Sequence, residues 1–298
     1  MSLALIDADI IAFQAAAANQ QSVDWGEGDG ATVTIDVPGA IDAARRLADE
    51  WTRLAGCRES VLCFSSREGR NFRRTILPTY KMNRKGGKPE AYWQVVDALE
   101  ASFKVHRIEG LEADDVMGIL STSDKFAQSV VVTIDKDLGG VPCRLFNPRN
   151  DIRPRQVRIG QADLWWMTQT LTGDTTDGYS GCPKVGPKNA EKILGPCGLH
   201  LGSMWNAVVE AYEAKGLTEE DALVQARVAR ILRRSDYNRE EGTIALWHPT
   251  TPSSLCLASV PSSSASTVTP QDAESPSSPA PSKSVGSRRS SSRARSRT

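Results

Sequence analysis

The feature that most constrains the fold is a set of short apolar runs that alternate with helical patterns. The three runs are Leu3 to Ile6, Val61 to Phe64 and Val130 to Ile134. Apolar residues recur with helical spacing in the segments after them and between them, at about 40–55, 90–103 and 112–127. Short buried strands that alternate with helices predict an α/β fold with a central, mostly parallel sheet flanked by helices. Open parallel sheets bind their ligands at the carboxyl ends of the strands.

The pattern changes twice along the chain, which predicts three parts. After residue 160 the strand signal gives way to helical periodicity at 162–171, 188–194, 203–215 and 219–234, apart from a short stretch at 243–247. Residues 251–298 hold 17 Ser and 6 Pro, with too little apolar area to offset the entropy of ordering. We expect an α/β domain over 1–160, a helical subdomain over 161–249 and a disordered tail over 250–298.

Composition excludes several classes of protein. The chain has 298 residues with 36 Lys plus Arg and 36 Asp plus Glu, so it is no uniformly basic nucleic-acid coat. Its six cysteines lack the spacing of a zinc knuckle and it has only three histidines, which argues against a zinc site. It has neither a basic leader segment nor an apolar run of about 20 residues. We expect a cytoplasmic protein with reduced thiols.

Eight carboxylates are predicted to gather at one edge of the sheet. Each has an ordinary explanation alone: acids at 112–115 would cap a helix, and those at 135–137 and 174–177 suit turns. Together they would repel, by about 3 kcal/mol for a pair about 6 Å apart at an effective dielectric of about 20, unless cations neutralise them. Oxygen ligands without His or Cys select Mg²⁺ or Mn²⁺, and two such ions support phosphodiester hydrolysis. The predicted ligands are Asp7, Glu112, Asp114, Asp115, Asp135, Asp137, Asp174 and Asp177.

A basic segment follows the second apolar run directly and therefore begins at the same edge. Its cations are Arg67, Arg70, Arg73, Arg74, Lys81, Arg84, Lys85 and Lys88. A solvated charged loop is the simplest interpretation. Over an anionic metal pocket, however, these side chains would neutralise phosphates, and Tyr80 would stack on an unpaired base.

A glycine-containing turn at 181–190 runs into a helix with Pro187 in its first turn. An ordinary helix–turn–helix hairpin explains this pattern. Backbone N–H groups at such a helix start also form an anion site, to which Lys184 and Lys188 would add charge. The P-loop pattern is absent. We interpret the turn as a non-specific clamp on a duplex backbone.

Five motifs in order carry a resemblance to a known family. They are LIDAD at 5–9, NFR at 71–73 with PTYKMNR at 78–84, EADD at 112–115, TIDKDL at 133–138, and GDTTD at 173–177 followed by GPKNA at 186–190. The chain resembles the 5′→3′ exonucleases of the flap endonuclease family, most closely the free-standing phage replication type.

The resemblance implies roles for individual residues. Asp7, Glu112, Asp114, Asp135 and Asp137 would hold the catalytic metal, and Asp115, Asp174 and Asp177 the second metal or its water. Lys81 and Arg84 would be catalytic, in a basic arch at about 66–90. The turn at 173–190 would be a helix–three-turn–helix that grips DNA and binds K⁺. The implied DNA-binding residues are Arg73, Arg74, Tyr80, Lys81, Arg84, Gly181, Lys184, Gly186 and Lys188.

Three positions depart from the family pattern. Ser65 and Ser66 stand where the family often has Asp after the second strand, Gly178 stands where Asn is usual, and Lys184 occupies a turn position that is often Gly. The first departure would remove a metal ligand. The third would weaken K⁺ coordination and add a phosphate contact.

These observations predict an Mg²⁺-dependent 5′→3′ exonuclease on duplex DNA that removes 5′ flaps or RNA primers in phage DNA replication. The expected substrates are duplex DNA with a 5′ end or flap and RNA–DNA hybrids. Replication proteins are expected partners. A related nuclease that acts on RNA is one alternative. A non-catalytic DNA-binding or scaffolding protein that lost its chemistry through Ser65 is another.

Overall fold

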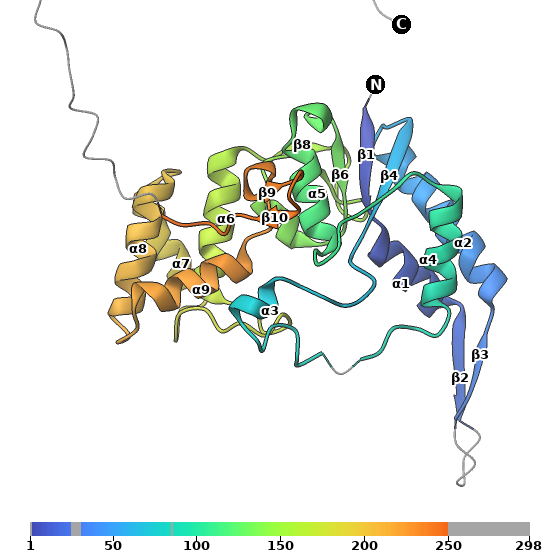
Figure 1. The fold of residues 1–298 in the computed structure, drawn as a ribbon, viewed down its shortest axis with the longest axis horizontal. Coiled ribbons are helices and arrows are strands. Elements are labelled where there is room, and N and C mark those ends of the chain that lie inside the picture. The colour runs from blue at the N-terminus through green and yellow to red at the C-terminus, as the bar shows by residue number, and fades with distance from the viewer. Residues whose placement is uncertain (1, 25–30, 85, 250–298) are drawn as a thin grey trace, which may run out of the picture. The chain divides into compact units, whose positions relative to one another are not determined.

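The computed structural model describes residues 2–24, 31–84 and 86–249, and its centre is one six-stranded sheet (Figure 1). The strand order is β5-β4-β1-β6-β7-β8, and β8 alone pairs antiparallel with its neighbour. The strands are β1 (Leu3–Asp7), β4 (Glu59–Phe64), β5 (Val105–Arg107), β6 (Val130–Val132), β7 (Arg144–Phe146) and β8 (Arg155–Gln156). The predicted, mostly parallel sheet is confirmed.

Side chains of the central strand β1 alternate between two apolar layers. Ala4 and Ile6 pack into a cluster with α1 (Ala8–Ala18), α2 (Val37–Leu54) and α4 (Tyr92–Ser102). Leu5 points the other way, into a cluster with α5 (Ala113–Ser121). Alternation of this kind follows from the two-residue period of a strand. Helices therefore cover both faces of the sheet, and only its edges bring side chains to solvent.

The helices that follow the sheet pack around a separate apolar cluster and form the helical region, defined here as residues 159–229. It comprises α6 (Ile159–Thr172), α7 (Pro187–Leu194), α8 (Leu201–Glu213) and α9 (Glu219–Ala229). Trp166, Met204 and Tyr212 are at its centre. The four predicted helices are present, but α9 ends five residues before the predicted end because the backbone at 230–232 is bonded to other segments, as described below.

Other elements escaped prediction or differ from it. The helix predicted at 112–127 ends at Ser121 and is followed by the short helix η1 (Asp124–Phe126). Helix α1 and the hairpin of β2 (Gln20–Asp24) and β3 (Ala31–Ile35) have no clear periodicity in the sequence. The remaining short elements are α3 (Arg73–Ile76), η2 (Lys136–Gly140), η3 (Gly195–Cys197), η4 (Arg234–Asp236), β9 (Tyr237–Asn238) and β10 (Thr243–Ile244).

Two expectations about the chain as a whole stay predictions. The Ser- and Pro-rich tail at 250–298 lies outside the described residues. The boundary near residue 160 is likewise untested. Among the described residues, no helix has the length and apolar character that a membrane crossing requires.

Candidate active site

Two adjacent strands of the sheet deliver carboxylates to one edge. Asp7 ends β1 and caps α1 by accepting a hydrogen bond from the Ile10 N–H at 3.3 Å, and the Thr133 hydroxyl donates to it at 3.0 Å. Asp135 follows the neighbouring strand β6. Burial, together with the charge of Asp9, raises the pKa of Asp7 to about 7. The first strand end is thus a buried acid whose charge the protein itself does not neutralise.

The start of α5 adds two carboxylates to this edge. Glu112 is the N-cap residue of the helix, and Asp114 lies in its first turn. Burial and the charges of Asp7, Asp135 and Glu112 raise the pKa of Asp114 well above its ordinary value. Three separate segments therefore bring Asp7 and Asp135 close enough to Asp114 to disfavour the ionisation of Asp114.

The 174–178 turn supplies the remaining acids from the helical region. Asp174 organises the turn by accepting hydrogen bonds from the N–H groups of Thr176 at 2.7 Å and Asp177 at 3.3 Å. Across from it, burial and the charge of Asp135 raise the pKa of Asp137 to about 7, and Asp174 and Asp177 contribute to that shift. One oxygen of Asp137, Oδ1, is buried without a hydrogen-bond partner.

Four carboxylates line one small cavity of about 20 Å³. They are Glu112, Asp114, Asp137 and Asp177. A half-buried, all-oxygen donor set in which Asp137 has an unpaired oxygen, and Asp114 and Asp137 have raised pKa values, suits a hard divalent cation. As placed, however, no three His, Cys, Asp or Glu side chains among the described residues are arranged to hold a metal ion. The donor chemistry therefore fits Mg²⁺ or Mn²⁺, while the coordinating geometry would need side-chain adjustment.

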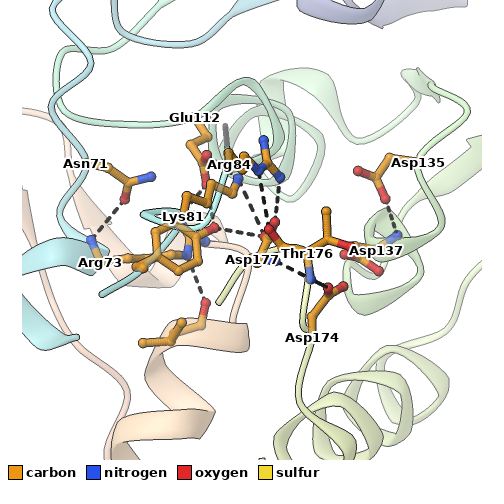
Figure 2. Close-up of polar contacts among 12 residues, drawn as sticks. Asn71, Arg73, Lys81, Arg84, Glu112, Asp135, Asp137, Asp174, Thr176 and Asp177 are labelled. Carbon is orange, nitrogen blue, oxygen red and sulfur yellow. Dashed lines mark hydrogen bonds and ion pairs between the residues drawn. The ribbon is translucent and has the colours of Figure 1, made fainter. Parts of the chain in front are cut away.

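The basic arch supplies cations that pair with two of these carboxylates. Lys81 binds Glu112 and lies 3.5 Å from Asp177, and Arg84 binds Asp177 as well. Figure 2 shows these two side chains converging on Asp177, with Asp135 and Asp137 to one side. Although burial alone would raise it, the charges of Lys81 and Arg73 bring the pKa of Glu112 down to about 2. Lys81 and Arg84 thus pair with two of the carboxylates that line the cavity, and their catalytic role stays a prediction.

Backbone contacts hold the base of the arch against the 174–178 turn. The Lys81 N–H donates to the Asp177 carbonyl at 2.8 Å. Gly178 has a φ of +76°, and a Cβ there would lie 3.1 Å from the carbonyl oxygen of Thr79. Glycine at position 178 therefore serves both the turn geometry and the close approach of the arch.

Two predicted site residues prove to be partners of each other. Arg73 is 2% exposed and Asp115 is fully buried, and the two form a bidentate ion pair. Arg73 is therefore inaccessible to DNA, and Asp115 has its oxygens engaged by protein donors. We correct both assignments: the buried pair belongs to the framework of the site.

Tyr80 and Gly181 also differ from their predicted roles. Tyr80 is 2% exposed, and its hydroxyl donates to Glu112 at 2.9 Å and lies 3.1 Å from Asp177, so its ring is not free to stack on a base. Gly181 is buried, and its N–H donates to the Gln225 side chain. A Cβ on Gly181 would lie 2.3 Å from the backbone nitrogen of Gly173, so this glycine allows two backbone segments to pack closely.

A larger cleft of about 680 Å³ opens beside the arch. Besides Lys81, Arg84 and Arg74, it is lined by Lys88 and Arg149. Arg149 follows β7 at the same edge of the sheet and was not predicted, because one arginine in a polar turn carries no signal alone. Lys88 lies 3.9 Å from the centre of the Tyr92 ring. Of the other predicted cations, Arg70 lines this cleft, and Lys85 lies outside the described residues.

The serine that replaces a family aspartate has a defined local role. The Ser65 hydroxyl accepts a hydrogen bond from the Ala113 N–H at 3.0 Å, in the first turn of α5. The Ser65 N–H donates to Asp9 at 3.0 Å, and the Tyr92 hydroxyl donates to Asp9 at 2.8 Å. Asp9 thus lies beside the site. The position of Asp9 two residues after Asp7 could have indicated that it lies beside the site, but no role was predicted for it.

A second basic surface lies on the helical region. A groove of about 560 Å³ between α7 and α8 is lined by Lys184, Lys192 and Lys215, and is called the lysine groove below. Lys184 adopts a left-handed φ of +63° in the turn before α7. Gly186 caps α7, and both it and Lys188 are exposed. This surface therefore carries exposed lysines, and its binding of phosphates stays a prediction.

Comparison with known proteins extends these observations. Residues 2–145 match the family model described as 5′-3′ exonuclease, N-terminal resolvase-like domain. An exonuclease of Escherichia phage T7 is 29% identical over 82% of this chain and 93% of its own length. An exodeoxyribonuclease of Enterobacteria phage T3 is 28% identical over 82% of this chain and 92% of its own length.

Solved structures share the fold at lower identity. The flap endonuclease of bacteriophage T5, crystallised in a complex with DNA and metal ions, aligns with a TM-score of 0.56 at 15% identity, over 77% of this chain and 89% of that one. A T5 structure co-crystallised with metal ions aligns with a TM-score of 0.55 at 14% identity, over the same shares.

Proposed function

We propose that this chain, whose residues 2–145 match the 5′-3′ exonuclease family model, is an Mg²⁺-dependent (or Mn²⁺-dependent) 5′→3′ exonuclease on duplex DNA that also removes 5′ flaps or RNA primers during phage replication. The single observation that carries the proposal is the cavity between Glu112, Asp114, Asp137 and Asp177, two of whose carboxylates pair with Lys81 and Arg84. Carboxylates that would hold metal ions lie there beside cationic side chains that would hold phosphate.

Two sets of carboxylates would hold two divalent ions in the proposed reaction. Asp7, Glu112, Asp114, Asp135 and Asp137 would hold one divalent ion, and Asp174 and Asp177 a second. When bound, such ions supply an activated water and neutralise charge at the scissile phosphate. Binding would also ionise Asp7 and Asp137, because their raised pKa values reflect a charge that burial and neighbouring carboxylates disfavour.

Lys81 and Arg84 would exchange partners when DNA enters. In the structure they neutralise Glu112 and Asp177. A divalent ion would take over that neutralisation, and the two side chains would then be free to bind the scissile phosphate and its developing charge. Tyr80 would keep Glu112 oriented through its hydroxyl.

Duplex binding is proposed for the helical region. Lys184 and Lys188 would contact backbone phosphates beside the start of α7, where no side chain caps the helix. K⁺ forms no part of the proposed function, because the ammonium of Lys184 already brings positive charge to this turn.

The proposal is tested by digestion of a 3′-labelled duplex and a matched 5′-flap substrate with Mg²⁺, Mn²⁺ or EDTA. We expect ion-dependent loss from the 5′ end and no loss in EDTA. The matched control is Asp135→Asn, which should bind DNA and cleave far more slowly. Tight binding without cleavage in either ion would favour the scaffolding protein, and preference for an all-RNA substrate would favour the RNA nuclease.

A further inference from the structure

The guanidinium of Arg73 joins three segments of the chain from a buried position at the base of the arch. Nη1 and Nη2 each donate to Asp115 at 2.7 Å. Nε donates to the Val228 carbonyl at 2.8 Å, and Nη2 donates to the Arg230 carbonyl at 2.7 Å. Nη1 also lies 3.5 Å from Glu112. All five donors of the group therefore have an acceptor, in the fixed fork geometry that only arginine provides.

Asp115 adds two backbone contacts to this junction. Its Oδ1 accepts from the Leu232 N–H at 3.1 Å, and its Oδ2 accepts from the Glu112 N–H at 3.3 Å. One carboxylate thus fixes the N-cap residue of α5, which carries a predicted metal ligand, and the segment 230–232. These contacts replace the hydrogen bonds that would have continued α9.

A second point of contact confirms how closely α5 and this segment pack. Gly118 lies one turn after Asp115 on the same helix, and a Cβ at position 118 would lie 2.3 Å from the Leu232 carbonyl oxygen. Segment 230–232 is therefore attached to α5 by hydrogen bonds at Asp115 and by direct backbone packing at Gly118. Neither contact has a flexible side chain that could take up a shift.

The junction links the two surfaces that a DNA substrate would touch. Segment 230–232 directly follows α9, which packs on α6 and α8 of the helical region. Arg73 itself begins α3, eight residues before Lys81. The lysine groove lies on the helical region, whereas Glu112 and Lys81 lie at the cleavage site. The buried ion pair is therefore one of the contacts that fix the distance between these two surfaces.

We propose that Arg73 and Asp115 are positioning residues that set the register of cleavage, meaning the number of nucleotides between the gripped duplex and the phosphate that is cut. The inference rests on the proposed nuclease function. One nucleotide corresponds to about 3.4 Å along the duplex axis, so a shift of that size between the two surfaces would move the cut by one position.

The test measures product lengths at single-nucleotide resolution on a 3′-labelled 5′-flap substrate in single-turnover reactions. Arg73→Lys keeps the charge beside Asp115 but cannot serve three acceptors at once. Asp115→Asn keeps the shape and removes the charge. Gly118→Ala leaves the ion pair intact and pushes segment 230–232 away from α5. We expect each variant to spread its products by one nucleotide around the wild-type position.

The matched control is Asp163→Asn. It breaks the buried ion pair with Arg233, whose oxygen–nitrogen distance is 2.7 Å, in the same part of the fold but without a contact to the arch. We expect it to lower the melting temperature and leave the product lengths unchanged. A spread of products with this variant too would overturn the inference, because any destabilisation would then produce it.

Hydrogen exchange at the Leu232 amide shows whether the junction has opened, independently of activity. We expect faster exchange in Arg73→Lys and Asp115→Asn than in wild type. Faster exchange with wild-type product lengths would overturn the inference while leaving the proposed function intact. If the wild-type protein cut no substrate, the proposed function would fail instead. The register would then be measured from a hydroxyl-radical footprint of the bound flap substrate. An unchanged footprint boundary in the variants would overturn the inference.

Discussion

The phenol of Tyr80 donates a hydrogen bond of 2.9 Å to the carboxylate of Glu112. This contact joins the basic arch to the N-cap of α5 inside the protein. It uses the polar end of a side chain whose ring is buried among apolar residues of the helical region. The arch is thereby tied to a carboxylate of the site before any substrate arrives.

We expect Tyr80→Phe to lower the rate of cleavage about tenfold, since a hydrogen bond to a charged group contributes about 1.5–3 kcal/mol. The ring stays, so folding and KM should change little. Single-turnover rates and KM on the flap substrate check this. An unchanged rate would show that the hydrogen bond from Tyr80 to Glu112 does not support cleavage.

Lys81→Ala should lower kcat by about 10²–10³-fold, the usual effect of removing a group that stabilises developing charge. The matched control is Lys125→Ala, an exposed lysine on η1 that makes no ion pair with the described residues. Steady-state rates at saturating Mg²⁺ provide the measurement. Equal losses in the two variants would refute a catalytic role for Lys81.

The stability of the protein in EDTA should fall as pH rises from about 4 to about 7. The pKa values of Asp7 and Asp137 are raised from 3.8 to about 7. In that window the folded protein holds protons that the unfolded chain has released, so the free energy of unfolding decreases with pH. Glu112, with its pKa near 2, contributes stability that is lost only at lower pH.

Denaturant unfolding at pH 5 and pH 8 measures this slope, and Asp137→Asn should reduce it. Mg²⁺ should stabilise the protein more at pH 8 than at pH 5, because ion binding must displace those protons at the lower pH. An unfolding free energy that is flat across the window would show that the two acids are not buried in the way described.

Replacing Lys184 or Lys188 by Ala should weaken duplex binding and leave the cleavage rate of bound DNA unchanged. Each loss should reduce the slope of log K against log salt by about one, because one phosphate contact is removed. Binding isotherms at several salt concentrations test this. An unchanged slope would place the duplex elsewhere on the protein.

Sequence reasoning found the sheet and most of the carboxylates because both depend on local pattern. Asp7 and Asp135 follow apolar strands, and a parallel sheet brings such ends together. The ion pair between Arg73 and Asp115 could not be predicted in this way. Its members are 42 residues apart, and each also fits an exposed role in its own motif. Burial decided between those roles, and burial depends on how α3, α5 and the segment after α9 pack in three dimensions.

The same limit explains the end of α9 and the position of Tyr80. Residues 230–232 have helical periodicity, but their backbone groups bond to Arg73 and Asp115. Tyr80 lies among cations in the sequence, yet its ring packs with the helical region. In both cases a contact with a distant residue outweighed a correct local preference.

Asp7 caps a helix and also carries an unneutralised buried charge. Asparagine caps helices about as well as aspartate and carries no charge. In metal-free protein, Asp7→Asn should therefore fold at least as stably as the native chain while losing a predicted ligand. At position 7, the stability of the metal-free fold favours asparagine, whereas metal binding favours aspartate. Selection for a robust fold alone would lead away from the acid, which supports the proposed role of Asp7 as a metal ligand.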